Sequence, residues 1–179
     1  MLFPRYLIVI MLFMLAGCDD LNPSADDIRP SVNCGDTGPD VCQTAPEFSL
    51  SDTLGNTVSI PEALFGTDGG VLYFTMWCPI CDSHMSHLRN YVIPNYPNVK
   101  FYIVDYVSGT VELSRSAQIS NVYTDMTVLV DSIQEVLSLY EATMGTTIVI
   151  EYADGPGIVR MNEDYKDGTK LIKTLDALP

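Results

Sequence analysis

The chain has 179 residues, 47% of them hydrophobic, and a formal charge of −14 from 23 acidic and nine basic side chains. This length suits one domain of about 100–150 residues with a short extension. The negative charge repels nucleic acid and anionic lipid headgroups, so we expect neither as a ligand.

The first 17 residues have the composition of an export signal. Arg5 precedes an apolar run over residues 7–15, which is shorter than the roughly 20 residues of an ordinary membrane-spanning helix. The run ends in Leu15-Ala16-Gly17-Cys18, which resembles the lipobox of bacterial lipoproteins. The resemblance implies a signal peptide at 1–17, cleavage before Cys18, and diacylglycerol on the Cys18 sulfur. We therefore expect a protein of the bacterial cell envelope, facing the periplasm or the cell exterior, that touches the membrane through its lipid anchor. An ordinary secretory signal or an uncleaved anchor is the alternative.

Residues 18–44 are rich in Asp, Pro, Ser, Asn and Gly and show no apolar periodicity, which predicts a flexible acidic tether. Two cysteines, Cys34 and Cys42, lie within it. In an exported protein such a pair usually forms a disulfide, here around residues that turn easily. We expect a structural disulfide, with a second redox centre as the alternative.

Residues 45–179 carry the patterns of a globular domain. Apolar alternation or β-branched runs predict strands at 56–60, 71–76, 99–105, 126–130, 146–151 and 158–161. Helical patterns occupy 61–65, 82–92 (ending before Pro94), 110–119, 132–140 (with Asp131 as N-cap) and 167–178. Strands that alternate with helices, and a closing hairpin and helix, predict an α/β fold whose sheet is covered on both faces.

The segment Trp77-Cys78-Pro79-Ile80-Cys81 joins the apolar strand at 71–76 to the helix that follows. A thiol at a helix N-terminus lies near unpaired backbone N–H groups and the positive end of the helix dipole, which stabilise a thiolate. Cys81, one turn later, is placed to resolve a mixed disulfide formed on Cys78. The motif therefore indicates thiol–disulfide chemistry.

With Ala45–Leu50, Val128–Asp131 and Thr146–Ile150 in matching order and spacing, this motif resembles the thioredoxin-like fold. The most similar branch is the TlpA-like, membrane-anchored thiol–disulfide oxidoreductases. That resemblance implies a central mixed β-sheet with helices on both faces and a C-terminal β-hairpin plus helix. It implies Cys78 as attacking thiol and Cys81 as resolving thiol, with Trp77 and Pro79 supporting them and no cofactor. Its implied partners are envelope protein disulfides, which it would reduce, and a membrane thiol electron donor.

The sequence departs from that family pattern in two places. The cis-proline that usually precedes the strand facing the thiols is replaced by Gly145, directly before Thr146. Leu72 stands where a buried acid or amide often lies, six residues before the first cysteine. Substrate contact at the loop around Gly145, and the path of the Cys81 proton, are therefore open points.

Two other chemistries use some of the same residues. Cys78, Cys81 and one of His84 and His87 are possible zinc or copper ligands, but steps of three residues drift about 60° around a helix and prevent all four from converging. We expect no metal site and histidines packed on the helix or solvated. Thr75-x-x-Cys78-Pro79 resembles the peroxiredoxin arrangement, which makes a thiol peroxidase an alternative. A non-enzymatic thioredoxin-like binding module is a third possibility, which a test of insulin reduction separates from an enzyme.

The lipidation expected at Cys18 is testable in membrane extracts. Intact-protein mass spectrometry should find a chain that begins at Cys18 and carries diacylglycerol, and Cys18→Ser should abolish the modification because the acylated sulfur is gone. A cleaved, soluble and unlipidated wild-type product would contradict the assignment.

Overall fold

The computed structural model describes residues 31–152 and 155–179. The expected signal peptide 1–17, the lipidation site Cys18, the expected tether as far as residue 30, and Ala153 and Asp154 of the last turn lie outside these residues. Within the described residues no helix has the length and apolar character needed to cross a membrane.

Seven strands form one mixed sheet in the order β2-β1-β5-β4-β3-β6-β7. The pairs β3–β4 and β4–β5 are parallel and the remaining neighbours are antiparallel. The strands are β1 (Phe48–Asp52), β2 (Thr57–Ile60), β3 (Gly69–Thr75), β4 (Val99–Asp105), β5 (Thr127–Val130), β6 (Thr146–Glu151) and β7 (Ile158–Asp164). The expected α/β, thioredoxin-like architecture is confirmed, including the closing β6–β7 hairpin and final helix.

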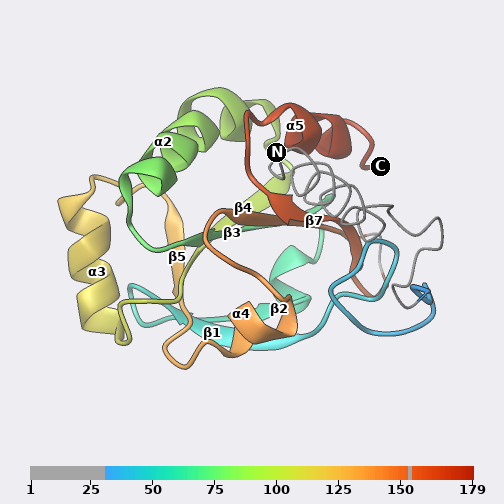
Figure 1. Ribbon diagram of the computed structural model, residues 1–179, viewed down its shortest axis with the longest axis horizontal. Helices are drawn as coiled ribbons and strands as arrows, with labels where there is room; N and C mark the ends of the chain where they lie inside the picture. The colour runs from blue at the N-terminus through green and yellow to red at the C-terminus, as the bar shows by residue number, and fades with distance from the viewer. Residues whose placement is uncertain (1–30, 153–154) are drawn as a thin grey trace, which may run out of the picture. The chain divides into compact units, whose positions relative to one another are not determined.

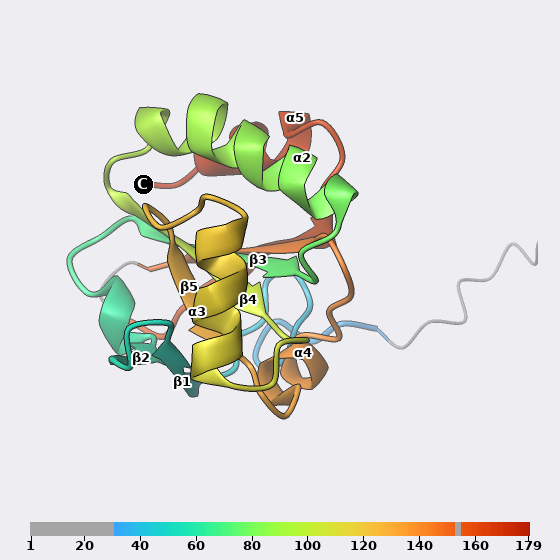
Figure 2. The same ribbon diagram turned by 90° about the vertical axis from the view of Figure 1, so that its left-hand side faces the viewer.

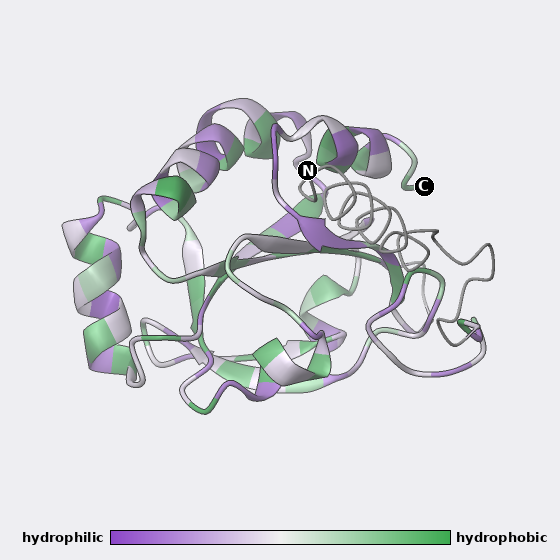
Figure 3. Ribbon diagram, viewed as in Figure 1, coloured by the Kyte–Doolittle hydropathy of each residue, from purple (hydrophilic) through white to green (hydrophobic). Residues whose placement is uncertain are grey.

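Helices cover both faces of this sheet, α2 and α5 side by side on one face and α4 on the other (Figures 1 and 2). Hydrophobic and hydrophilic residues alternate along α2 and α3, as expected for helices with one packed side (Figure 3). The helices are α2 (Pro79–His87), α3 (Val111–Ser120), α4 (Glu135–Leu139) and α5 (Thr169–Leu175), with shorter helical turns at Glu62–Leu64, Leu88–Val92 and Ile93–Asn95.

Strand β3 is buried along its whole length. Because side chains alternate across a strand, Leu72 and Phe74 join the core that includes α4, whereas Val71 and Tyr73 join the core under α2 and α5. Tyr73 and Cys78 therefore belong to the same side of the molecule as α2.

Three helices differ from their predicted bounds. The helix of the Cys pair begins earlier, at Pro79, and its helical path continues past Pro94, which occupies the first turn of a 3-10 segment where its missing N–H costs nothing. The helix predicted at 132–140 begins only at Glu135, and the Asp131 carboxylate accepts from the N–H groups of Glu135 and Leu137 from outside it. The helix predicted at 167–178 is likewise shorter.

The Cys34–Cys42 loop belongs to the folded unit, which begins at Val32 and not at residue 45. The expected disulfide is present. The Cys42 N–H donates to the Val159 carbonyl at 2.9 Å, and the Val159 N–H donates to Gln43 at 3.0 Å. A polar composition predicted a tether here, but these backbone bonds dock the loop on the edge of β7.

Removal of this disulfide should weaken the fold without disabling the thiol pair. For a loop of this length the double change Cys34→Ser and Cys42→Ser should lower the free energy of unfolding by about 2–3 kcal/mol, measured by urea denaturation. Thiol exchange at Cys78 should remain close to that of the wild type. A large loss of exchange in the folded variant would instead mean that the loop takes part in electron transfer.

Candidate functional site

The two thiols meet at the start of α2. Cys78 is the N-cap, and its sulfur accepts from the Cys81 N–H at 3.2 Å. The two Sγ atoms lie 2.8 Å apart, and either can be the hydrogen-bond donor to the other. Pro79 occupies the first helical turn, where it needs no hydrogen-bond acceptor.

The two sulfurs differ in exposure. Cys78 is half-buried, whereas Cys81 is fully buried. Burial raises the pKa of Cys81, but hydrogen bonds from the Cys78 side chain, from the backbone of Met76 and Cys78, and from Thr75 outweigh it and bring this pKa below its ordinary value. An outer sulfur that meets substrate and a sheltered one that forms a stable anion suit a two-step exchange.

Trp77 is held beside the pair by a buried carboxylate. Its backbone has a left-handed φ of 58°, its N–H donates to Thr75 Oγ1 at 3.1 Å, and its indole Nε1–H donates to Asp105 Oδ2 at 2.8 Å. The other oxygen of Asp105 accepts from the N–H groups of Val107 and Ser108, both at 3.1 Å. Asp105 thus joins the loop after β4 to the loop before α2.

The loop before β6 faces the outer thiol through Met144, whose Sδ accepts from Cys78 Sγ at 3.5 Å. Gly145 has a φ of 86°, a conformation that favours glycine. Its N–H donates to Phe74 and its carbonyl accepts from the Tyr165 N–H. Both polar groups of the Gly145 backbone are therefore already occupied. Thr146 points elsewhere, with its hydroxyl bonded to Asp164.

Both histidines pack against tyrosines. His84 Nδ1 lies 3.0 Å from the Tyr73 hydroxyl, and His87 Nδ1 lies 2.5 Å from the Tyr165 hydroxyl. Within residues 31–152 and 155–179, no three Cys, His, Asp or Glu side chains are grouped closely enough to hold a metal ion.

Sequence reasoning did not identify Asp105, Met144 or the role of Tyr73 at this site. Asp105 had a usable signal, because it ends a strand parallel to β3 and the carboxyl ends of parallel strands lie at one edge. Met144 and Tyr73 had no such signal in the sequence. The position of Met144 depends on the conformation of its loop, and that of Tyr73 on which face of β3 its side chain occupies.

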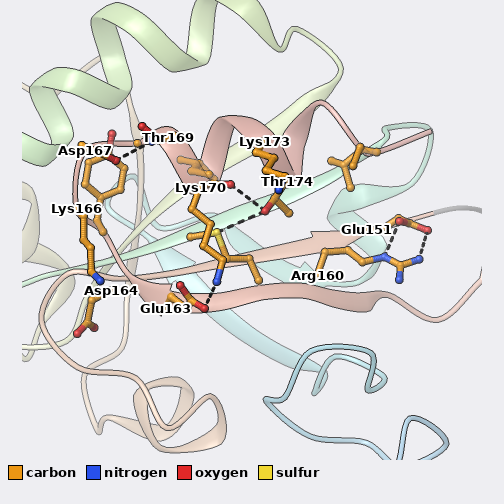
Figure 4. A pocket seen from close by; sticks show the side chains of 16 residues that line it. Glu151, Arg160, Glu163, Asp164, Lys166, Asp167, Thr169, Lys170, Lys173 and Thr174 are labelled. Atoms are coloured by element: carbon orange, nitrogen blue, oxygen red, sulfur yellow. Dashed lines mark hydrogen bonds and ion pairs between the residues drawn. The ribbon is translucent and has the colours of Figure 1, made fainter.

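A cavity of about 870 Å³ lies elsewhere, between β7 and α5 (Figure 4). Neither cysteine of the pair lines it. Two ion pairs line it, Arg160 with Glu151 and Lys170 with Glu163, so these four charges already have partners within the protein. This cavity is therefore not part of the thiol site.

Comparison with known proteins places the chain in a family. The model of the AhpC/TSA family matches residues 41–154, which include the Cys pair and most of the sheet. The chain belongs to the AhpC/TSA family. A comparison of this AhpC/TSA-family protein with curated proteins found no match.

Solved structures of the same fold include several thiol–disulfide proteins. DsbF of Mycobacterium tuberculosis is 22% identical over 74% of this chain and 95% of its own, with a TM-score of 0.58. A secreted M. tuberculosis disulfide oxidoreductase, described as homologous to E. coli DsbE, is 22% identical over 73% of this chain and 96% of its own, with a TM-score of 0.55. A thiol-disulfide oxidoreductase from Bacteroides fragilis is 20% identical over 76% of this chain and all of its own, with a TM-score of 0.60. At these identities the similarity establishes the fold.

The Asp105 carboxylate should be important for stability. Asp105→Ala leaves three N–H groups without their acceptor and should cost about 2–4 kcal/mol in the free energy of unfolding, whereas Trp77→Phe should cost about 1 kcal/mol. Because the two side chains share a bond, the double variant should be less destabilised than the sum of the single variants. Asp176→Ala, which removes an exposed carboxylate bonded to Tyr96, is the control and should change little. Strict additivity in urea denaturation would rule out the coupling.

Proposed function

We propose that this AhpC/TSA-family protein is a thiol–disulfide oxidoreductase that works outside the cytoplasmic membrane, held there by lipid on Cys18. The observation that carries the proposal is the pairing of a half-buried N-cap thiol with a buried thiol 2.8 Å away. Several solved proteins of this fold are described as thiol–disulfide oxidoreductases, which supports the same chemistry here.

The reaction proceeds in two exchanges. The Cys78 thiolate attacks one sulfur of a substrate disulfide, and the other substrate sulfur leaves as a thiolate. Cys81 then loses its proton and attacks Cys78, which closes the Cys78–Cys81 disulfide and releases the second substrate thiol. The substrate gains two electrons and the enzyme loses two.

The direction we propose is reduction of envelope protein disulfides. A membrane thiol carrier would return the enzyme to the dithiol by the reverse exchange. Location outside the cytoplasm is supported by the lipobox-like Leu15–Cys18 and by the Cys34–Cys42 disulfide, since such bonds persist in oxidising compartments. A similar protein from M. tuberculosis is described as secreted.

A thiol peroxidase is the second candidate, favoured by Thr75-x-x-Cys78-Pro79. In the structure, however, the Thr75 oxygen accepts from the Trp77 N–H, and its hydroxyl is a hydrogen-bond partner of Cys81. The hydroxyl that would orient a peroxide on Cys78 therefore serves the other sulfur. This geometry favours disulfide exchange over peroxide reduction.

Trapping of mixed disulfides tests the division of roles. Cys81→Ser should accumulate mixed disulfides with envelope proteins, because the attacking thiol remains and the resolving thiol is gone, whereas Cys78→Ser should trap few or none. Non-reducing gels of membrane extracts measure both. The wild type should also reduce insulin, and a Cys78–Cys81 potential well below about −200 mV would support a reductant, whereas a value near −120 mV would indicate an oxidant. Equal trapping by the two variants, with no insulin reduction, would overturn the proposal in favour of a binding module.

A further inference from the structure

The resolving thiol is buried and must lose a proton when it attacks Cys78. The Cys81 side chain is 0% exposed, so its proton must pass through the protein. Its hydrogen-bond partners are the Cys78 sulfur, which carries the substrate in the mixed disulfide, and the backbone of Met76 and Cys78 and the Thr75 hydroxyl, which stabilise a thiolate. Leu72, at the position where the resemblance places an acid, packs in the core on the other side of β3. The exit path therefore runs through another side chain.

Tyr73 and His84 provide such a path. Burial, the charge of Cys81 and a side-chain hydrogen bond with Cys81 raise the pKa of Tyr73, and the Tyr73 hydroxyl lies 3.0 Å from Nδ1 of His84. Tyr73 is 1% exposed in β3, whereas His84 is only half-buried, one turn beyond Cys81 in α2. The three groups lead from a buried sulfur to an imidazole that reaches solvent.

The ionisation of both side chains suits a relay. Burial, and then the charge of Cys81, raises the pKa of Tyr73, so its hydroxyl stays protonated. Burial, and then His87, lowers the pKa of His84, so the imidazole is neutral at neutral pH and Nδ1 is free to accept a proton.

We propose that Tyr73 is a catalytic residue that carries the proton of Cys81 to His84 while Cys81 resolves the mixed disulfide on Cys78. The inference rests on the proposed disulfide exchange. As the Cys81 S–H bond breaks, its proton passes to Tyr73 Oη, and the hydroxyl proton of Tyr73 passes to His84 Nδ1. The Cys81 sulfur forms its bond to Cys78, the bond from Cys78 to the substrate sulfur breaks, and the substrate sulfur leaves with the electron pair and takes a proton from water. His84 returns its proton to solvent. Because His84 acts through Tyr73, it is a positioning residue.

The other titratable groups near this path offer no alternative route for the proton of Cys81. His84 is surrounded by Tyr73 from β3, by Tyr165 from the segment after β7 with ring centres 4.7 Å apart, and by His87 from its own helix. Tyr165 is already bonded to His87.

Tyr106 directly follows β4, and its pKa is raised by burial and by the charges of Cys81 and Cys78. Asp105 has both oxygens occupied by N–H donors. Tyr73 is therefore the titratable side chain that bonds Cys81 and also has an onward acceptor.

A single-turnover reaction with 5,5′-dithiobis(2-nitrobenzoate), an aromatic disulfide whose thiolate product is coloured, separates the two exchanges. One equivalent of reagent reacts with reduced protein in a stopped-flow instrument. The first coloured thiolate is released when Cys78 attacks, and the second when Cys81 resolves the mixed disulfide. Tyr73→Phe should leave the first rate within about twofold and slow the second about tenfold or more, as for loss of a proton-transfer group.

His84→Gln should slow the second release in the same way and remove the imidazole inflection from its pH profile, whereas the wild type keeps that inflection. His87→Gln is the matched control, a histidine on the same helix that bonds Tyr165, and both of its rates should stay close to those of the wild type at a pH where His84 is neutral. His84 is half-buried, so its variant remains informative if Tyr73→Phe folds poorly.

Each outcome decides one of the two proposals. Absence of a second release from wild-type protein would overturn the exchange function itself. A normal second release from wild type, Tyr73→Phe and His84→Gln would leave the exchange function in place and overturn the relay. Equal slowing by His84→Gln and His87→Gln would also overturn it, because the effect would then belong to the packing of α2.

Discussion

Strand β3 is fully buried between a parallel and an antiparallel neighbour, and it positions each part of the thiol site. Its carboxyl end delivers Cys78 to the first turn of α2. The Phe74 carbonyl holds the Gly145 N–H, which places Met144 against the outer sulfur, and Thr75 holds the Trp77 N–H. A shift of this strand by one residue would exchange its two faces, so the buried register also determines that Tyr73 lies below α2.

The site stabilises sulfur anions with neutral donors. The three arginines in the described part of the chain are occupied elsewhere, Arg89 with Val122 and Asp125, Arg115 with Gln118, and Arg160 with Glu151. Backbone N–H groups and a hydroxyl at a helix start take the place of a cation. An anion held in this way depends little on salt, because its donors are fixed by covalent geometry and by burial.

The sequence was sufficient for the architecture because the strongest signals are local. The apolar run before the Cys pair and the β-branched Thr146–Ile150 have few alternatives to buried strands, and the Cys pair dictates a strand–helix junction. Helix ends were harder to predict from the sequence. Asp131, for example, caps α4 from four residues before its first residue. The site beyond the two cysteines depends on contacts between distant segments, such as Trp77 with Asp105 and Cys78 with Met144, which spacing along the chain does not encode. The sequence did not predict the docking of the Cys34–Cys42 loop for a similar reason. The hydrogen bonds that dock it join backbone groups, which the composition of the loop does not reveal.

That docked loop also changes what the outermost strand offers to other molecules. β7 ends the sheet, and Thr44 pairs with Ile158 in an antiparallel bridge while Cys42 and Gln43 bond Val159, so the free polar groups at this end of the strand are covered. An uncovered edge strand is a template for pairing with another chain and for aggregation. The small covalent ring therefore covers the sheet edge at this end of β7.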